Sequence, residues 1–270
     1  MSRLAPALVA ALAIAACAPF EPPPPAESTL REERGDPTVE ARTRAAIAAA
    51  EAAPADPRAA LAASRWLFVA ADWRMQRATC EWLRAHPAAA RADVLAADER
   101  VPEGVRKEVA SLCARGLEFA DRAAARLPDD VDARLHQALH TSLLAWSQGA
   151  AKALVAGYGR KITVAVDAAV ALDPKHDGAA PLRLAGRFRS QAPWPYGDKP
   201  AAERALQRAV QLTPNLVNRL FFGDALAASK RFAEAELEWR AAVDAPSDAA
   251  TEWTAGFLRE QARRRLAAPE

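Results

Sequence analysis

The feature that most constrains the fold of this chain is a spacing of small residues that recurs along it. Small or apolar residues follow one another at steps of four and three, and a proline comes four or five residues later. Five segments carry this pattern: Ala45-Ala49-Ala52-Pro57, Gly116-Ala120-Ala123-Pro128, Ile162-Val166-Ala169-Pro174, Ala202-Leu206-Ala209-Pro214 and Ala235-Trp239-Ala242-Pro246. Residues at these steps share one face of a helix, small ones allow close packing, and proline ends the helix. The pattern predicts stacked helical hairpins, which build binding surfaces more often than active sites.

The composition supports an all-α fold. About a quarter of the 270 residues are alanine, and no segment alternates β-branched and polar residues between turn signals. The 36 basic and 34 acidic residues are mixed along the chain and give a net charge of +2. An extended basic face for nucleic acid is therefore not expected.

The helix boundaries follow from caps and prolines. We expect about ten to eleven helices, with hairpins that end near Pro246 and a final helix over 247–266 that caps the stack. Earlier helices are expected over 37–52, 57–83, 91–98, 103–127, 131–148 and 181–190. The segment 57–83 forms either one long helix or two short ones. A less regular passage around Tyr158 precedes the segment that begins at Ile162.

The N-terminus resembles a bacterial lipoprotein signal. Arg3 precedes an apolar stretch over 4–16 that is too short to span a bilayer, and Ile14-Ala15-Ala16-Cys17 resembles a lipobox. The resemblance implies that residues 1–16 are removed and that the Cys17 thiol carries a lipid, which adds about 0.8 kcal/mol of membrane affinity per buried methylene. Ala18, in place of aspartate, favours the periplasmic side of the outer membrane over the inner membrane. An uncleaved apolar helix or an ordinary secretory signal is the alternative.

Two further regions complete the expected organisation. Residues 17–36 contain the run Pro22-Pro23-Pro24-Pro25 and are interpreted as a poorly ordered tether, and residues 37–270 as a single repeat domain. Cys80 and Cys113 lie in a chain predicted to occupy an oxidising compartment. They form either a disulfide, worth about 3–4 kcal/mol, or two buried thiols.

The repeat spacing is similar to that of tetratricopeptide repeats, whose unit of about 34 residues has small residues at fixed positions. Gly186 and Gly223 fit the eighth position of that unit. More narrowly, three segments resemble the T component of tripartite ATP-independent periplasmic transporters: Gly116-Leu117-Glu118-Phe119-Ala120, Leu172-Asp173-Pro174 and Pro193-Trp194-Pro195-Tyr196-Gly197-Asp198. The resemblance covers about residues 102–246. It implies a repeat lipoprotein that works with a periplasmic substrate-binding protein.

No phosphate loop, nucleophile elbow or zinc-ribbon spacing is present in the sequence. His136 and His140 are one helical turn apart, with Asp132 a further turn back, which is a spacing that can bind a divalent metal. Gln137 stands where a zinc protease has its glutamate base, so we expect polar, exposed or partly buried histidines and no metal site.

Arg183 and Arg187 are the strongest ligand candidates. On a tetratricopeptide-like register they face the concave surface one turn apart, where two guanidinium groups can hold a carboxylate. The alternative is a solvated face or structural ion pairs with Asp173, Asp177 or Asp198.

The loop that follows these arginines is rich in aromatic residues and proline. Trp194 and Tyr196 either line a pocket beside the arginines or pack onto neighbouring helices to cover an insertion.

The resulting functional expectation is a non-catalytic, lipid-anchored transport accessory. It would bind a small, carboxylate-bearing ligand together with a soluble binding protein or another envelope protein, and it would need no cofactor. The alternative is an envelope scaffold that holds peptide or protein segments. Homo-oligomers are compatible with either function.

Overall fold

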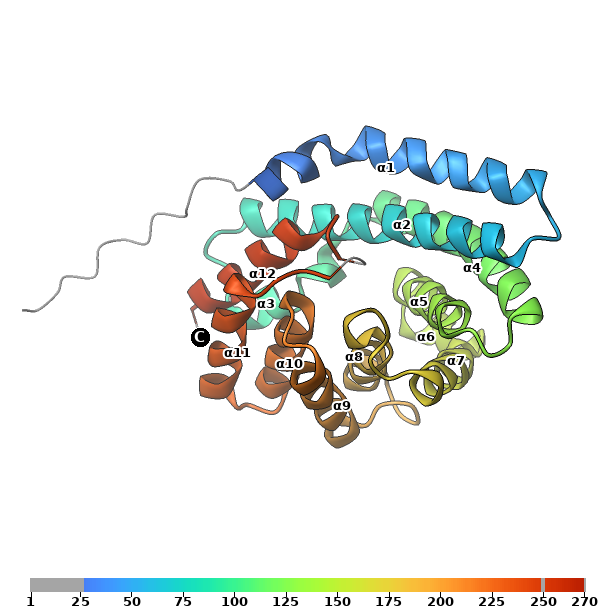
Figure 1. Ribbon diagram of the computed structural model, residues 1–270. Coiled ribbons are helices and arrows are strands. Elements are labelled where there is room, and N and C mark those ends of the chain that lie inside the picture. Colours follow the sequence, from blue (N-terminus) through green and yellow to red (C-terminus); the bar gives the residue numbers. More distant parts are fainter. Residues whose placement is uncertain (1–26, 249–250, 270) are drawn as a thin grey trace, which may run out of the picture.

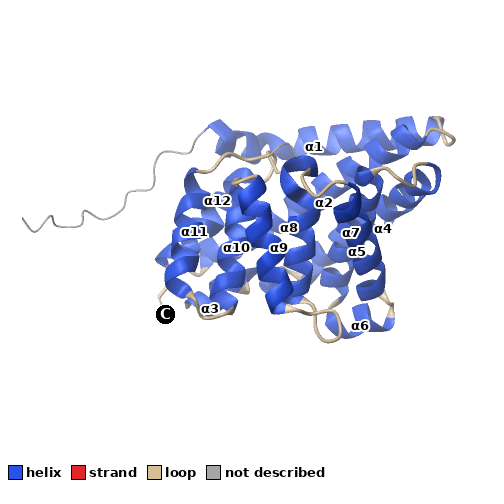
Figure 2. Cartoon of the chain, turned by 60° about the horizontal axis from the view of Figure 1, so that its bottom comes forward, coloured by secondary structure: helices blue, strands red, loops and turns tan. Residues whose placement is uncertain are grey.

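The computed structural model describes residues 27–248 and 251–269, and within this part every regular element is helical (Figures 1 and 2). The all-α prediction is confirmed. The elements are α1 (Glu27–Ala52), α2 (Pro57–Ala85), α3 (Arg91–Leu95), the short 3-10 helix η1 (Ala97–Arg100), α4 (Glu103–Arg126), α5 (Val131–Gln148), α6 (Ala150–Val155), α7 (Tyr158–Leu172), α8 (His176–Gln191), α9 (Lys199–Leu212), α10 (Leu216–Ala228), α11 (Phe232–Asp244) and α12 (Ala255–Ala267).

Several helix starts are fixed by side chains that bind free backbone N–H groups. Asp56, Asp130 and Asp198 each accept a backbone hydrogen bond from the first turn that follows, at 2.8 to 3.1 Å. Such caps stabilise a helix by about 1 kcal/mol each. They explain why α2 and α5 begin at the predicted residues.

The first helix differs from its prediction. It begins at Glu27, so it includes residues 27–36, which were assigned to the tether, and Pro37 lies inside it. In the sequence, Asp36-Pro37 has the pattern of a capped helix start. A helix can also pass through a proline at the cost of one hydrogen bond. The signal segment 1–16 and Cys17 lie outside the described residues.

The helices form two concentric layers that close into a ring (Figure 1). The inner ring consists of α2, α5, α8, α10 and α12, each of which contacts the next, and α12 returns to α2. The outer layer consists of α1, α4, α7, α9 and α11. The long helix α2 runs across the arc and contacts α5 at one end and α12 at the other, so it joins the two ends of the stack.

The closure depends on specific contacts between α2 and α12. The Cys80 thiol donates to the carbonyl of Phe257 at 3.3 Å, and Gln261 Nε2 donates to Gln76 Oε1 at 2.6 Å. In addition, the backbone N–H of Arg91, at the start of α3, donates to the carbonyl of Pro269, which follows α12, at 2.8 Å. The C-terminal helix therefore lies over the end of the stack as predicted, although it begins at Ala255 and not at residue 247, and it also packs against the N-terminal part of the chain.

Glycines permit close approach between the layers. A Cβ atom on Gly186 would lie 2.4 Å from Leu206 Cγ, and one on Gly223 would lie 2.5 Å from the Trp239 ring. Leu206 and Trp239 are fully buried. The spacing in the sequence thus corresponds to a large side chain that fills the space above a glycine in the preceding helix.

Candidate functional site

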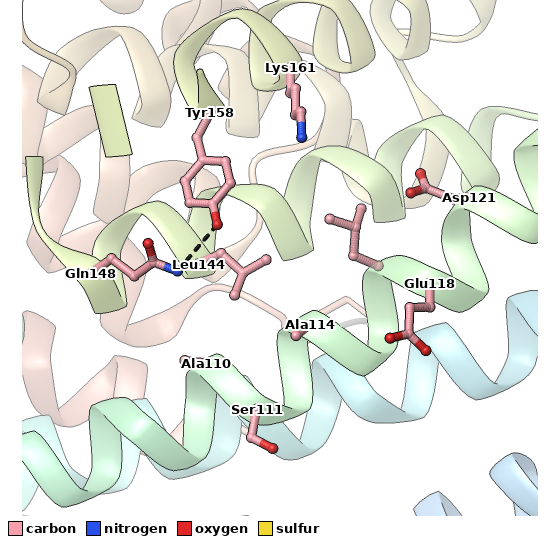
Figure 3. A pocket seen from close by; sticks show the side chains of 10 residues that line it. Ala110, Ser111, Ala114, Glu118, Asp121, Leu144, Gln148, Tyr158 and Lys161 are labelled. Carbon is pink, nitrogen blue, oxygen red and sulfur yellow. Dashed lines mark hydrogen bonds between the residues drawn. The ribbon is translucent and has the colours of Figure 1, made fainter. Parts of the chain in front are cut away.

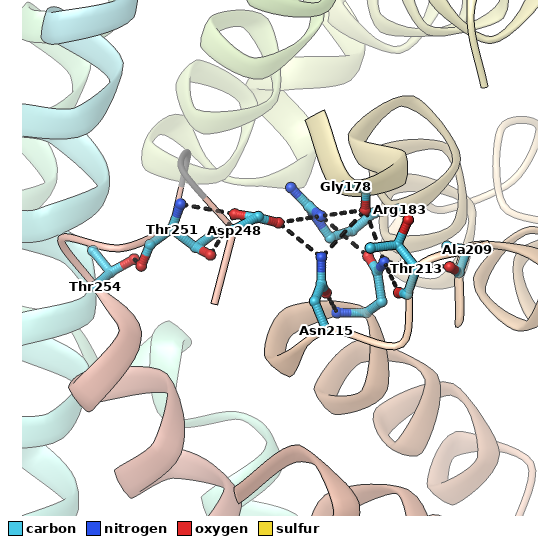
Figure 4. Close-up of polar contacts among 9 residues, drawn as sticks. Gly178, Arg183, Ala209, Thr213, Asn215, Asp248, Thr251 and Thr254 are labelled. Atoms are coloured by element: carbon cyan, nitrogen blue, oxygen red, sulfur yellow. Dashed lines mark hydrogen bonds and ion pairs between the residues drawn. The ribbon is translucent and has the colours of Figure 1, made fainter. Parts of the chain in front are cut away.

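The polar centre of the ring is organised around the carbonyl of Gly178, near the start of α8 (Figure 4). This oxygen accepts hydrogen bonds from Arg183 Nη1 at 3.3 Å, Asn215 Nδ2 at 3.3 Å and Asn218 Nδ2 at 2.9 Å. Arg183 Nη1 also donates to Asn218 Oδ1 at 3.1 Å. Residues of α8 and α10 and of the turn before α10 therefore meet at one point.

The backbone at this point is strained. Asp177, Gly178 and Ala179 have φ values of 45°, 67° and 64°. Two of the three residues carry a Cβ atom, which makes a left-handed backbone cost about 1–3 kcal/mol each. The helix predicted over 181–190 is the regular part of α8 that follows this turn. Strain of this kind persists only where surrounding contacts hold it, and it concentrates at functional sites.

The carboxylate of Asp248 completes the cluster (Figure 4). Asp248 Oδ2 accepts from Arg183 Nη1 at 3.1 Å and from Asn215 Nδ2 at 2.9 Å. Asp248 Oδ1 accepts from the backbone N–H of Thr251 at 2.9 Å and from its hydroxyl at 2.5 Å. Four donors thus surround one carboxylate, as they would in a binding site for a carboxylate ligand.

Two further carboxyl groups in this region have raised pKa values. Burial raises the pKa of Asp72, although hydrogen bonds from Gln76 and Thr254 oppose the shift. Burial also raises the pKa of Asp177, and the negative charge of Asp248 adds to the effect. Additional negative charge is therefore unfavourable in the ring centre.

A second ion cluster lies about one turn further along α8. Arg187 Nη1 is 3.1 Å from Asp224 Oδ2, and Arg187 Nη2 is 3.7 Å from Asp98 Oδ2. Asp224 also accepts from Arg265 Nε at 2.7 Å and from Trp239 Nε1 at 3.1 Å. This cluster ties η1, α8, α10 and α12 together.

Arg183 and Arg187 both take carboxylate partners from the chain itself, but they do not share one. The partners are Asp248 for Arg183, and Asp224 and Asp98 for Arg187. None of these is an acid that the sequence suggested. Asp224 and Asp248 come from later elements, which the curvature of the stack brings back to α8. That Arg183 and Arg187 bind one external ligand together stays a prediction.

The aromatic loop lies at the other end of α8, after Gln191. Trp194 is 87% exposed, whereas the Tyr196 ring packs against Gly159 and lies 6.3 Å from the ring of Phe188. The loop and Arg183 are separated by most of the helix, roughly 16 Å at 1.5 Å per residue. The position of Tyr196 agrees with the alternative in which the loop packs onto neighbouring helices. Trp194 neither packs inward nor lies beside Arg183.

The two histidines are buried, so the expectation of exposed or partly buried side chains is wrong. His140 Nε2 lies 3.0 Å from Ser64 Oγ, and its ring occupies the space above Gly116. Burial lowers the pKa of His140 to about 4 and lowers that of His136 as well. No group of three or more His, Cys, Asp or Glu side chains in the described residues is placed to hold a metal ion.

The disulfide alternative is wrong for Cys80 and Cys113, which are buried free thiols. Cys80 contacts Phe257 on the side of α2 that meets α12, whereas Cys113 of α4 packs with Val109 and Leu144. The two sulfur atoms thus belong to different parts of the core. Burial raises the pKa of both thiols, which keeps them protonated.

A separate groove lies between α4, α5 and α7 (Figure 3). Its volume is about 520 Å³, and its lining includes Ser111, Ala114, Glu118, Leu144, Tyr158 and Lys161. Gln148 Nε2 donates to the Tyr158 hydroxyl at 3.2 Å on one side of the groove. Sequence reasoning missed this groove, because its small residues on α4 are indistinguishable from those that pack helices.

No helix in the described part of the chain has the length and apolarity to cross a membrane. Comparison with protein-family models finds no match for the chain, and no curated protein matches it.

Proposed function

We propose that the protein is a non-catalytic transport accessory that binds a small carboxylate-bearing ligand in the centre of its helical ring. The observation that carries this proposal is the set of four donors around the Asp248 carboxylate, from Arg183, Asn215 and Thr251. In this proposal Asp248 occupies the site as an internal ligand.

The closed ring favours a small ligand over an extended peptide. Because α12 packs against α2, the inner helices form a continuous boundary around the cluster. A long segment would need a groove that is open at both ends. The proposed site differs from a purely apolar transport pocket, because charged side chains line it.

The electrostatics indicate how a ligand would enter. The raised pKa values of Asp72 and Asp177 mean that another negative charge cannot be added cheaply beside Asp248. A carboxylate ligand must therefore displace Asp248 from Arg183 and Asn215. Asp248 lies in the connection between α11 and α12, so displacement would move that connection.

Calorimetric titration with succinate tests the proposal. Asp248→Asn removes the competing charge and keeps the side-chain shape, so we expect succinate to bind about tenfold tighter or more than to wild type. Asp244→Asn is the matched control, because Asp244 is exposed and ends α11. Arg183→Gln in the Asp248→Asn background should abolish the gain. Equal affinities in the Asp248→Asn and Asp244→Asn variants would contradict the proposal.

We further propose that Cys17 anchors the protein to the periplasmic face of the outer membrane, where a soluble binding protein is its partner. The lipobox-like sequence before Cys17 supports this part of the proposal. Cys17→Ser should prevent incorporation of labelled palmitate and release the protein from the membrane fraction. Palmitate labelling that persists in Cys17→Ser would contradict it.

The groove between α4, α5 and α7 favours a second candidate, an envelope scaffold that holds a protein segment. Its small side chains leave room for an inserted chain, and Glu118 and Lys161 offer charges of both signs. Ala114→Trp would fill the groove and leave the ring centre untouched. Loss of partner binding in that variant, with succinate binding unchanged, would favour the scaffold.

A further inference from the structure

The two most exposed large apolar side chains of the described residues lie at one end of the ring. Val155 is 90% exposed and Trp194 is 87% exposed, and Leu154 beside Val155 is 50% exposed. Val155 ends α6, and Trp194 lies in the loop between α8 and α9. The contact of Tyr196 with Gly159 places that loop against the start of α7, next to α6 (Figure 2). We call Leu154, Val155 and Trp194 the apolar rim.

Basic side chains surround the apolar rim. Residues 148–166 contain no aspartate or glutamate, and they carry Lys152, Arg160 and Lys161, all exposed. Lys199, also exposed, follows the loop. Asp198, the acid nearest to Trp194 in the sequence, uses its carboxylate to cap α9 at 2.9 Å from Ala201 N. Lys161 also lines the groove that holds Glu118 and Asp121, so the local excess of positive charge at the rim depends on Lys152, Arg160 and Lys199.

These cations differ from the other basic groups nearby. Among the side chains of residues 37–248 and 251–269, no ion pair engages Lys152, Arg160, Lys161 or Lys199. Arg189, at the end of α8, pairs with Asp167 at 2.7 Å. Lys161 lies over the Tyr158 ring at 5.9 Å, and, after the hydrogen bond from Lys107, the charge of Lys152 contributes to the lowered pKa of Glu103, but neither Lys161 nor Lys152 forms an ion pair among those residues. The chain thus pairs a neighbouring arginine and leaves the cations of the rim without a direct carboxylate partner in this part of the chain.

The rim is built to project from the ring. Gly149 and Gly157 have positive φ values of 82° and 69°, which end α5 before α6 and separate α6 from α7. Pro193 and Pro195 flank Trp194 and restrict its backbone. Little conformational entropy is lost when such side chains bind.

We propose that the apolar rim and its cations form a peripheral binding surface for an anionic phospholipid membrane. Projecting aliphatic and indole side chains enter the headgroup boundary, and unpaired cations attract anionic lipid. A protein partner would have to supply a packed, complementary pocket for Trp194. The rim, however, consists of two separate projections, the end of α6 and the loop between α8 and α9. The proposal is independent of a lipid on Cys17.

A site-specific probe tests the proposal in the full chain with Cys17→Ser. Cys80 and Cys113 are buried, so a cysteine introduced at the surface can be labelled selectively with an environment-sensitive fluorophore. Val155→Cys places the probe on the rim. Leu237→Cys is the matched control, because Leu237 is an exposed aliphatic residue of α11, 65% exposed, in another part of the ring.

Vesicles of phosphatidylcholine mixed with phosphatidylglycerol should shift the emission of the Val155→Cys probe to the blue and leave the Leu237→Cys probe unchanged. Lys152→Glu should weaken vesicle binding by about fivefold or more, whereas Arg240→Glu on α11 should not. Trp194→Ala should weaken it on the order of tenfold.

Three results would overturn the proposal. The first is an equal response of both probes, because binding would then come from another part of the chain. The second is an equal response to pure phosphatidylcholine vesicles, which would exclude a role for the cations. The third is a response of the rim probe to a purified protein partner but not to vesicles, which would assign the rim to protein recognition.

Discussion

Two glycine contacts in different parts of the ring each make room for a buried side-chain ring of the following helix, but the two side-chain rings differ in chemistry. In the C-terminal hairpin, Gly223 of α10 receives the Trp239 ring from α11, the second helix of the same hairpin. In the N-terminal part, Gly116 of α4 receives the His140 ring from α5, the next helix along the chain. In both contacts the next helix along the chain supplies the ring, so a small residue permits a close approach but does not determine which side chain fills the space.

The polar atoms of the two rings also differ in how well they are satisfied. Trp239 Nε1 donates to Asp224 Oδ1 at 3.1 Å. His140 Nε2 contacts Ser64, but its Nδ1 has no hydrogen-bond partner among the described residues. The C-terminal contact is therefore expected to be the more stabilising one and the N-terminal contact the one that depends on pH.

The largest effect should follow from Trp239→Ala. Removal of this fully buried ring leaves a cavity above Gly223 and deprives Asp224 of one donor, so the free energy of unfolding should fall by about 3–5 kcal/mol. Urea unfolding followed by circular dichroism measures the change. Trp194→Ala is the control and should change stability by less than about 0.5 kcal/mol, because Trp194 is exposed. Similar losses in both variants would break the comparison.

The second effect concerns pH and His140. Burial lowers the pKa of His140 from 6.5 to about 4, so between these values the unfolded chain binds a proton that the folded chain does not. The free energy of unfolding should therefore fall as the pH drops from 6.5 towards 4, by up to about 3 kcal/mol from this group. Above pH 6.5 this group should contribute no pH dependence.

Unfolding of wild type and His140→Gln at pH 7 and pH 5 isolates this contribution. The stability of His140→Gln should fall less over that interval, although His136, whose pKa is also lowered by burial, still titrates in both proteins. An identical pH dependence in the two proteins would show that His140 is not responsible.

A third, smaller effect is expected for Gly116→Ala. The new Cβ atom would lie 2.1–2.6 Å from the His140 ring, and that ring is fully buried and cannot move aside easily. Overpacking of this kind costs about 1–3 kcal/mol, although alanine has the higher helix propensity. A gain in thermal stability would mean that the contact between α4 and α5 is loose.

The smallest effect should come from Gly104→Ala in the same helix. No atom lies within 4 Å of the added Cβ, and Gly104 lies in the first turn of α4. Only the higher helix propensity of alanine then affects stability, and the melting temperature should rise by an amount equivalent to at most about 1 kcal/mol. A loss of stability here would remove Gly104→Ala as a control for Gly116→Ala.

The sequence predicted the helices well because their signals are local. Asp130 before Val131 and Gly149 after Gln148 set the limits of α5 within the chain segment itself. The start of α1 was misplaced because Asp36-Pro37 has the same appearance at a helix start and inside a helix.

The candidate site was less predictable because it depends on the closure of the ring. Arg183 was singled out from its position on the helix, but its partner Asp248 is 65 residues away. The left-handed turn at Asp177 and Ala179 had little signal in sequence apart from Gly178: aspartate adopts that conformation more often than most residues do, but alanine does not favour it. Buried histidines were missed because the glycine that accommodates His140 lies on another helix.

The docking of α12 on α2 has a consequence for biosynthesis. Translation produces α2 long before α12, so the face that carries Trp73 and Cys80 has no cover until residue 257 has been made. The nascent chain must keep this surface from aggregating in the meantime. A premature stop before residue 255 would yield an open arc, with a thiol that the finished protein conceals.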